Sequence, residues 1–276
     1  MKIFYKVLYN KLNKLEIKAG DTIYLGVNLG NIFKNYHSLL FKNNSDLNKI
    51  KITCSDILFS GLKKYLGKNG TIIVPTFSFQ FIKTKYYNKI CTKSSLGFFE
   101  NFFFKQKGVS RSNHPINSIS IWGKNKNILN PCGNFSFGNN SPFSNFTNHS
   151  VKFVNLGSKW VETCTYVHHL EHLNGFNHRF YKPTTGFTII NNKKIKDTFY
   201  NPVRFYKLKS KKAEFKIEKY LINRKKIKTN LSQFYSSSIK SEDIYNIGLI
   251  ILKKDPSFFM SKKTIVYLNN DDKLLF

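Results

Sequence analysis

The stretch SDILFSGLKKYLGKNGTIIVP, residues 55–75, determines the fold class expected for this chain. Its first half, Ser55–Leu66, places apolar side chains on one helical face and therefore predicts a helix. These side chains are Ile57, Leu58, Leu62 and Leu66. Gly67 and an Asn-Gly pair end the helix, and the apolar run Thr71–Val74 that follows has the length of a strand, which Pro75 ends. A helix joined by a tight turn to an apolar strand is typical of an α/β sheet.

The same alternation extends to both sides of this stretch. Short apolar runs predict strands at Asp21–Leu25, Ser118–Trp122 and Val151–Leu156. An aromatic-rich segment, Gly97–Lys107, predicts a further helix that Gly108 closes. Strands that alternate with helices predict an α/β fold with a central mixed sheet flanked by helices.

After Gly186 the pattern changes. Phe187–Ile190 and the residues from Lys193 onward predict a hairpin, because the Asn191-Asn192 pair between them tolerates the positive φ values of a tight turn. The remaining features are a basic amphipathic stretch at Ala213–Leu221, an apolar run at Ile247–Leu252 and a last strand at Thr264–Leu268. Without repeats or a long low-complexity linker, we expect residues 1–276 to form one domain with an elaborated, β-containing C-terminal third.

The composition favours a globular intracellular protein. The 276 residues are long enough to bury a sizeable core, and 41% of them are hydrophobic. The four cysteines lie far apart, which argues against a disulfide framework. No run of about 18 apolar residues is present, as a membrane-spanning helix would need, and the lysine-interrupted N-terminus is a poor signal peptide. We therefore expect no membrane span and a cytoplasmic location.

The formal net charge of +30 has two explanations. It fits an anionic partner, such as nucleic acid, an acidic membrane or a phosphorylated small molecule. It also fits the codon composition of an A+T-rich genome, because Lys, Asn, Ile, Phe and Tyr are all abundant. No nucleic-acid motif accompanies the charge, so we expect no nucleic-acid partner. A basic protein that binds nucleic acid or a membrane surface stays as the non-enzymatic alternative.

The stretch TYVHHLEH, residues 165–172, contains the side chains best suited to catalysis. On a helix, Thr165, His168, Glu171 and His172 share one face. In one hypothesis, Glu171 orients His168 as a general base, with the Thr165 hydroxyl one turn earlier. In the other, His168 and His172 bind zinc and Glu171 activates water, as the H-x-x-E-H pattern allows. The candidates for a third zinc ligand are Glu214, Glu218 and Glu242.

Two loops offer groups that suit a phosphate or a carboxylate. The segment GVSRSNHPINS, residues 108–118, combines the planar fork of Arg111 with His114 and small hydroxyl residues. The segment GNNSPF, residues 138–143, could bring backbone N–H groups close to a phosphate.

Taken together and in order, these stretches resemble the aminoglycoside 3-N-acetyltransferase family, the antibiotic N-acetyltransferases that use acetyl-CoA. The resemblance spans roughly residues 13–190 and is loose beyond them. It rests on five segments, namely LEIKAGD (15–21), GTIIVPTF (70–77), GFFENF followed by R-S-N-H-P-x-x-S (97–118), S-P-F (141–143), and Leu156-Gly157 followed by T-x-x-H-x-x-E (165–171).

The resemblance implies an acetyl-CoA-dependent α/β enzyme that acetylates a small amine, without a metal. In it, His168 deprotonates the acceptor amine, Glu171 orients His168, and Thr165 acts near the thioester or the departing thiolate. The residues expected to contact the cofactor are Gly26, Asn28, Gly30, Arg111, Ser112, Ser118 and Ser141. Those expected to contact the acceptor are His114 and Phe77. A homo-oligomer is compatible with this family.

The chain departs from the family pattern at two places. The histidine and serines that usually follow the first strand are replaced by GVNLG, residues 26–30. One residue is also added between Gly157 and Thr165. The first change removes the usual hydroxyl contacts near the cofactor and leaves backbone N–H groups to hold its phosphates.

The charge balance bears on the acceptor. Aminoglycosides are polycations, whereas this chain has 45 Lys plus Arg against 15 Asp plus Glu. A positive long-range potential repels a cationic substrate. We therefore expect an anionic or nucleotide-linked amino sugar, of the kind used for surface glycans, rather than an aminoglycoside antibiotic.

Overall fold

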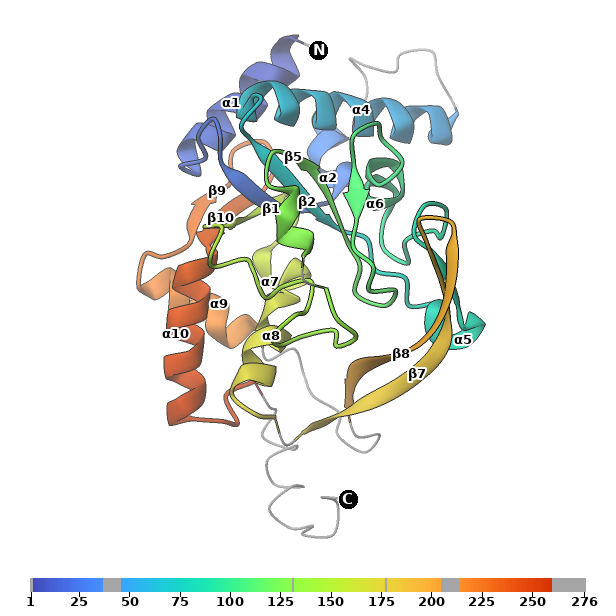
Figure 1. Ribbon diagram of the computed structural model, residues 1–276. Helices are drawn as coiled ribbons and strands as arrows, with labels where there is room; N and C mark the ends of the chain where they lie inside the picture. The colour runs from blue at the N-terminus through green and yellow to red at the C-terminus, as the bar shows by residue number, and fades with distance from the viewer. Residues whose placement is uncertain (1, 37–45, 131, 177, 205–213, 260–276) are drawn as a thin grey trace.

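A seven-stranded mixed sheet runs through the centre of the protein (Figure 1). The computed structural model describes residues 2–36, 46–130, 132–176, 178–204 and 214–259. The strand order is β4 (Ser110–Arg111), β5 (Ile119–Gly123), β2 (Thr71–Pro75), β1 (Thr22–Val27), β6 (Lys152–Leu156), β10 (Ser236–Lys240) and β9 (Lys228–Asn230). The three central strands β2, β1 and β6 are parallel, and the strands outside them are antiparallel to their neighbours. The predicted α/β class with a central mixed sheet is confirmed.

Helices cover both faces of this sheet, because successive side chains of a strand point to opposite faces. Ile23 and Leu25 of β1 pack in a core with α1 (Lys2–Lys14) and α4 (Leu47–Leu66). Tyr24, between them, packs on the other face with α8 (Tyr166–Leu173), α9 (Glu214–Asn223) and α10 (Ser241–Lys254). Figure 1 shows these two helical layers above and below the sheet. Burial on both faces explains why the central strands are continuous apolar runs.

The remaining helical segments of the first 165 residues are short. They are α2 (Leu29–Phe33), η1 (Lys34–Tyr36), α5 (Phe81–Thr84), α6 (Phe98–Phe103), η2 (Lys126–Leu129) and α7 (Trp160–Thr163). The predicted helix at Ser55–Leu66 is the second half of α4, which begins at Leu47 after an Asp46 side chain that caps its first turn. The helix expected over Gly97–Lys107 ends earlier, since α6 stops at Phe103 and the chain continues in turns.

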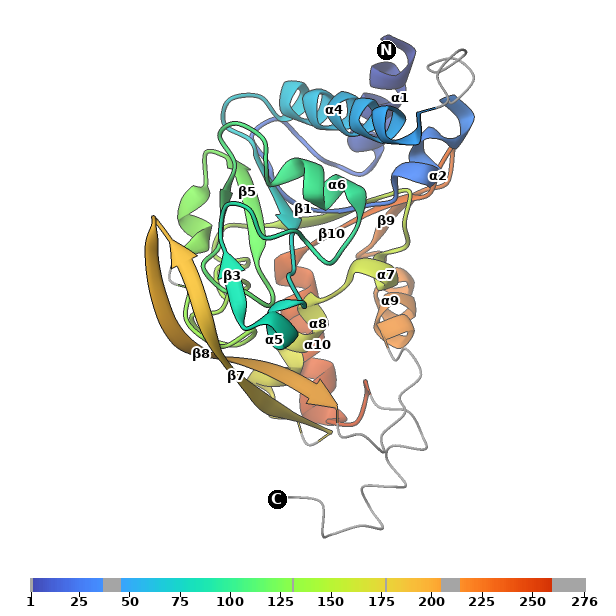
Figure 2. The ribbon, with the colours of Figure 1, turned by 90° about the vertical axis from the view of Figure 1, so that its right-hand side faces the viewer.

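A long hairpin forms the second sheet. Strands β7 (Arg179–Ile190) and β8 (Lys193–Arg204) pair over their whole length, and β3 (Tyr86–Asn88) runs parallel to β7. The turn residues Asn191 and Asn192 have φ values of 50° and 62°, as the sequence predicted. Figure 2 shows the hairpin curving along one side of the molecule. The hairpin begins well before Phe187, because residues 179–186 alternate in burial and pair like the rest of β7.

The rest of the C-terminal region is helical where an amphipathic or apolar run was noted. The run Ile247–Leu252 lies within α10, and the basic stretch from 213 to 221 largely coincides with α9. The strand expected at Thr264–Leu268 lies outside the described residues. Within the described ranges, no helix is both long and apolar enough to cross a membrane.

Candidate active site

The carboxyl ends of the three parallel strands meet around one cleft. Parallel sheets commonly bind ligands at this edge, because the loops that leave adjacent strands diverge there. The cleft has a volume of about 280 Å³, and we call it the central cleft. Its lining residues lie at or just after the ends of β1, β2 and β6, around the start of α6, or at the junction of α7 and α8. They are Gly26, Val27, Asn28, Pro75, Phe77, Leu96, Gly97, Glu100, Ser158, Thr163 and Thr165.

Helix α8 starts at the central cleft and presents the predicted pair. Thr165 directly precedes the first residue of α8 and lines the cleft. His168 lies one turn further along, and its backbone N–H donates to the Thr165 carbonyl. The Nδ1 atom of His168 lies 2.7 Å from Oε2 of Glu171. The His168 side chain keeps 23% of its surface exposed, whereas that of Glu171 keeps 4%. The structure therefore brings together a buried carboxylate and an accessible imidazole.

Two further side chains hold Glu171 in place. His178 directs Nε2 to Glu171 Oε1 at 3.1 Å, and Arg179, at the start of β7, places Nε 3.3 Å from Oε2. Burial raises the pKa of Glu171, but hydrogen bonds from His168 and His178 and the charge of Arg179 outweigh it and hold that pKa well below its usual range. Glu171 is thus an anion at neutral pH.

The two other histidines of the motif face different partners. Nδ1 of His169 accepts the backbone N–H of Gly138 at 3.1 Å, and burial, aided by nearby His172, lowers the pKa of His169 to about 4. Nδ1 of His172 lies 2.6 Å from the Tyr181 hydroxyl. A Cβ atom at Gly138 would come within 2.1 Å of His172 Nε2, so this ring is packed against the backbone. Neither histidine shares the contacts of His168.

The zinc hypothesis needs His168 and His172 as joint ligands with Glu171 free to activate water. Instead, Glu171 is bonded to His168, and His172 is bonded to Tyr181. Among the residues that the structure describes, no group of three or more His, Cys, Asp or Glu side chains is arranged to hold a metal ion.

Residues of the GVNLG segment, which the sequence predicts to contact the cofactor, line two adjoining clefts. Gly26 lines the central cleft, and a Cβ atom there would meet the Asn155 and Thr163 side chains at 2.4 and 2.6 Å. Asn28 caps α2 by accepting the N–H of Asn31 at 3.0 Å. Gly30 lines a second cleft of about 440 Å³, the apolar cleft. The two clefts adjoin, since Val27, Asn28, Gly97 and Glu100 line both.

Arg111 is buried and bonded within the protein. Its Nε donates to Ser118 Oγ at 3.2 Å, Nη1 to the Thr92 carbonyl at 2.6 Å, and Nη2 to Ser78 Oγ at 2.7 Å. Ser118 Oγ in turn donates to the Thr76 carbonyl, and Ser112 Oγ accepts the Ile119 N–H. These bonds join the loop at 108–118 to the end of β2. The cofactor contacts of Arg111, Ser112 and Ser118 stay predictions.

Of the three remaining predicted residues, one lines the central cleft and two are fully buried. Phe77 lines the central cleft. His114 is fully buried, accepts the N–H of Asn117 on Nδ1, and has a pKa that burial lowers to about 3. Ser141 is fully buried too, with its Oγ accepting the N–H of Phe143. Of the two acceptor contacts expected from the sequence, only that of Phe77 involves a residue that lines this cleft; both stay predictions.

Glu100 is a site residue that the sequence analysis missed. It sits in the first turn of α6, lines both clefts and is 7% exposed. Burial raises its pKa to about 7, although backbone N–H groups of Gly97 and Glu100 itself stabilise the anion. Glu100 is the one charged residue that lines the central cleft, among the residues described. The available signal was the Gly-x-x-Glu spacing that places a carboxylate at the start of a helix.

A buried carboxylate that orients an accessible imidazole is typical of enzymes that use general-base catalysis. The chain belongs to the aminoglycoside 3-N-acetyltransferase family, whose sequence model matches residues 44–248. It is therefore an acyltransferase by family. This membership decides against the zinc-hydrolase alternative and against a purely non-enzymatic binder. No curated protein sequence matches the chain significantly.

Solved structures share the fold. AAC-IIIb as a binary complex with CoASH has a TM-score of 0.71, with 14% identity over 91% of this chain and 96% of that one. AAC-VIa bound to sisomicin has a TM-score of 0.70, with 16% identity over 91% and 97%. The YokD protein from Bacillus subtilis has a TM-score of 0.70, with 16% identity over 92% and 94%.

Proposed function

We propose that this protein transfers an acetyl group from acetyl-CoA to an amine of an aminoglycoside. The observation that carries the proposal is the pair formed by His168 and Glu171 on α8, the helix whose N-cap residue Thr165 lines the cleft at the carboxyl edge of the parallel strands. Family membership and the two neighbours with CoASH and sisomicin supply the substrate classes.

The contact with Glu171 fixes the tautomer of His168. An ionised carboxylate only accepts hydrogen bonds, so Nδ1 of His168 carries the proton that Glu171 binds. A neutral His168 then has a free lone pair on Nε2. This nitrogen accepts the proton that the acceptor amine loses as it attacks the thioester carbonyl. The C–N bond forms, the C–S bond breaks, and the departing thiolate takes up the proton that His168 accepted, which restores the neutral imidazole.

Two adjoining clefts support acetyl-CoA as the donor. Acetyl-CoA supplies an activated thioester on a long arm that carries phosphates at its far end. The apolar cleft offers hydrophobic walls for such an arm, with Lys34 and Lys51 among its lining residues. Gly97 and Glu100 line both clefts, so an arm in the apolar cleft would end beside Thr165 and α8. We propose that the Thr165 hydroxyl acts at that end, on the thioester or the departing thiolate.

The acceptor is proposed to be cationic, in place of the anionic or nucleotide-linked amino sugar expected from the net charge. The neighbour AAC-VIa is bound to sisomicin, so the comparison favours an aminoglycoside. Glu100 gives the central cleft a carboxylate despite the basic composition of the chain. A local carboxylate at short range outweighs distant lysines that salt screens.

A free-thiol release assay tests this function. Purified protein is supplied with acetyl-CoA and, in separate reactions, with sisomicin or a nucleotide-linked amino sugar. We expect thiol release with sisomicin, loss of it in His168→Ala, and retention in the control His149→Ala. Release only with the nucleotide-linked sugar would restore the anionic acceptor, and no release with any amine would overturn the proposal. The cytoplasmic location and the homo-oligomer stay predictions.

A further inference from the structure

A third pocket, separate from the central and apolar clefts, lies at the opposite edge of the central sheet, where β6 begins. It has a volume of about 390 Å³, and we call it the basic cavity. The turn after α1, the turn after α9, the first turn of α10, and the strands β6, β9 and β10 form its walls. Its lining residues are Leu15, Glu16, Lys18, Lys152, Lys225, Lys226, Lys228, Ser238, Ile239, Lys240 and Asp243.

The basic cavity is separate from the candidate active site. Lys152 begins β6 in this cavity, whereas Leu156 ends the strand at the carboxyl edge, next to the loop that lines the central cleft. A strand rises about 3.3 Å per residue, so the two ends of β6 lie about 13 Å apart. The two sites also share no lining residue.

Lysines are concentrated here beyond the composition of the chain. Lys and Arg make up 45 of 276 residues, so eleven residues drawn at random would include about two of them. The basic cavity has six lysines among eleven lining residues, whereas the central cleft has none and the apolar cleft has two. Codon composition raises lysine everywhere and does not explain this local excess.

The sheet itself forces like charges together. Lys240 at the end of β10 pairs directly with Lys152 at the start of β6. Lys228 of β9 pairs with Ser238, two residues before Lys240 and therefore on the same face. Like charges directly opposite each other in a sheet are destabilising. An anion between these ammonium groups would relieve that repulsion.

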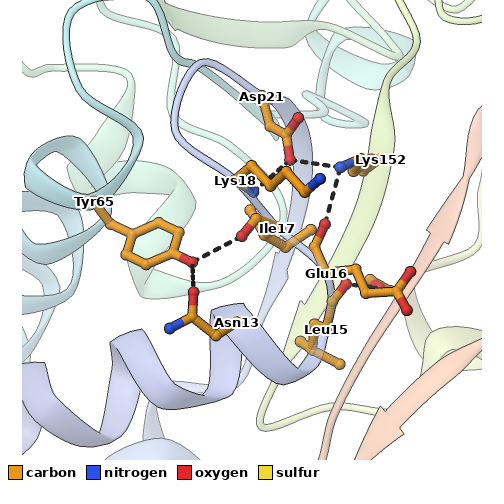
Figure 3. Close-up of polar contacts among 9 residues, drawn as sticks. Asn13, Leu15, Glu16, Ile17, Lys18, Asp21, Tyr65 and Lys152 are labelled. Atoms are coloured by element: carbon orange, nitrogen blue, oxygen red, sulfur yellow. Dashed lines mark hydrogen bonds and ion pairs between the residues drawn. The ribbon is translucent and has the colours of Figure 1, made fainter.

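Three lysines of the basic cavity are partly neutralised. Lys152 Nζ lies 2.6 Å from Asp21 Oδ2 and 3.0 Å from the Glu16 carbonyl, as Figure 3 shows. Lys228 pairs with Glu16 at 3.0 Å, and Lys226 with Asp243 at 2.8 Å. These contacts fix the positions of the ammonium groups without cancelling the charge of the cavity.

The other three lysines have no such partner. Lys18, Lys225 and Lys240 form no ion pair with a carboxylate of the described residues. Lys228, Lys240 and Lys152 also hold the pKa of Glu16 below its usual range, chiefly through the hydrogen bond from Lys228. The excess positive charge therefore belongs to residues that line one open pocket.

We propose that the basic cavity is a binding site for a small polyanion with linked phosphate groups, of the pyrophosphate or nucleoside polyphosphate class. Lysine ammonium groups bind phosphate oxygens as point charges, and several of them suit a ligand with several anionic groups. The volume lies within the range of small-ligand sites. The site is independent of the acetyl-transfer proposal, because none of its residues takes part in that chemistry.

Calorimetric titration at about 0.15 M salt tests the site, with pyrophosphate and ATP as separate ligands. The test variant is Lys225→Gln with Lys240→Gln. The matched control is Lys64→Gln with Lys68→Gln, which removes the same charge from exposed positions outside the cavity. We expect the cavity variant to weaken pyrophosphate binding at least about tenfold, and the control to weaken it less than about twofold.

The outcomes separate the alternatives. Equal losses in the two double variants would assign binding to diffuse charge and overturn the proposal, as would the absence of binding at millimolar pyrophosphate. Tighter binding of ATP than of pyrophosphate would identify a nucleotide ligand, and equal binding a phosphate chain. Because CoA also carries phosphates, pyrophosphate binding is measured in His168→Ala with excess CoA as well. If excess CoA displaces pyrophosphate equally with and without the two cavity substitutions, pyrophosphate binds in the clefts. That result would overturn the proposal.

Discussion

The Nδ1 atom of His168 lies 2.7 Å from Oε2 of Glu171, one turn further along α8. Both residues lie on one short helix, so their separation is set by helical geometry and not by the packing of distant segments. Packing supplies the second layer, since His178 and Arg179 approach the same carboxylate from the chain after α8.

Glu171→Gln should lower kcat by about 10²- to 10⁴-fold, the usual contribution of a positioned acid–base pair. The amide of Gln can donate to His168 Nδ1, which would shift the imidazole proton to Nε2 and block the base. Steady-state thiol release measures kcat, and KM for acetyl-CoA should change little. A variant with wild-type kcat would remove Glu171 from the mechanism.

Glu171 should also make stability depend on pH. Its pKa in the folded protein lies below the ordinary value, so its contribution to stability is present above about pH 4.5 and is lost as pH falls further. The difference in unfolding free energy between wild type and Glu171→Gln should shrink as pH falls from 6 to 3. Urea unfolding at several pH values measures this, and a constant difference would contradict it.

Glu100 should have the opposite dependence. Burial raises its pKa to about 7, so the folded protein keeps this proton where the unfolded chain has lost it. Stability relative to Glu100→Gln should therefore fall as pH rises from about 4.5 to 7, by about 2–4 kcal/mol. Binding of a cationic aminoglycoside should strengthen as pH rises through about 7 in wild type, relative to the variant. Calorimetry at pH 6 and 8 compares them, and equal pH slopes would exclude Glu100 from acceptor binding.

His172→Ala separates the general-base and zinc hypotheses. The variant loses the contact with Tyr181 and a packed ring, so a stability loss of about 1–3 kcal/mol is expected. Because the His172 side chain bonds to Tyr181 and not to the Glu171 carboxylate, kcat should fall less than about tenfold. Complete inactivation of a folded variant, with zinc lost at the same time, would favour a metal enzyme.

Arg111→Lys tests whether the guanidinium supports the fold. Lysine cannot reproduce the fork that reaches Ser118, Thr92 and Ser78, so buried acceptors lose their partners. We expect a loss of about 2–4 kcal/mol in urea unfolding. The exposed Arg204→Lys serves as control and should change stability by less than about 0.5 kcal/mol. A stable Arg111→Lys with weakened CoA binding would instead support the cofactor contact expected from the sequence.

The sequence predicted the parts of the fold that depend on local patterns. The helix before Thr71, the apolar strands and the turn at Asn191-Asn192 each follow from periodicity or turn chemistry. The N-terminal helix α1 was missed, because the lysines among its apolar residues were considered only as evidence against a signal peptide. Its apolar residues Phe4, Leu8 and Leu12 recur every four positions and are buried.

Part of the candidate site could be predicted from the sequence for the same reason. Thr165, His168 and Glu171 are close because they share a helix, and spacing alone indicates this. His178 and Arg179 reach Glu171 from the start of the hairpin, which no local pattern reveals. The burial of Arg111 and His114 depends on tertiary packing, and residue type alone suggests ligand contact equally well.

The two ends of the hairpin lie at very different distances from the candidate active site. Arg179 at the base of β7 contacts the Glu171 carboxylate, whereas Ile190, next to the turn at Asn191-Asn192, lies about 36 Å further along the strand by strand rise. Changes at that tip should leave the contacts of Glu171 intact. A reporter attached there by an engineer would therefore not disturb the orientation of His168.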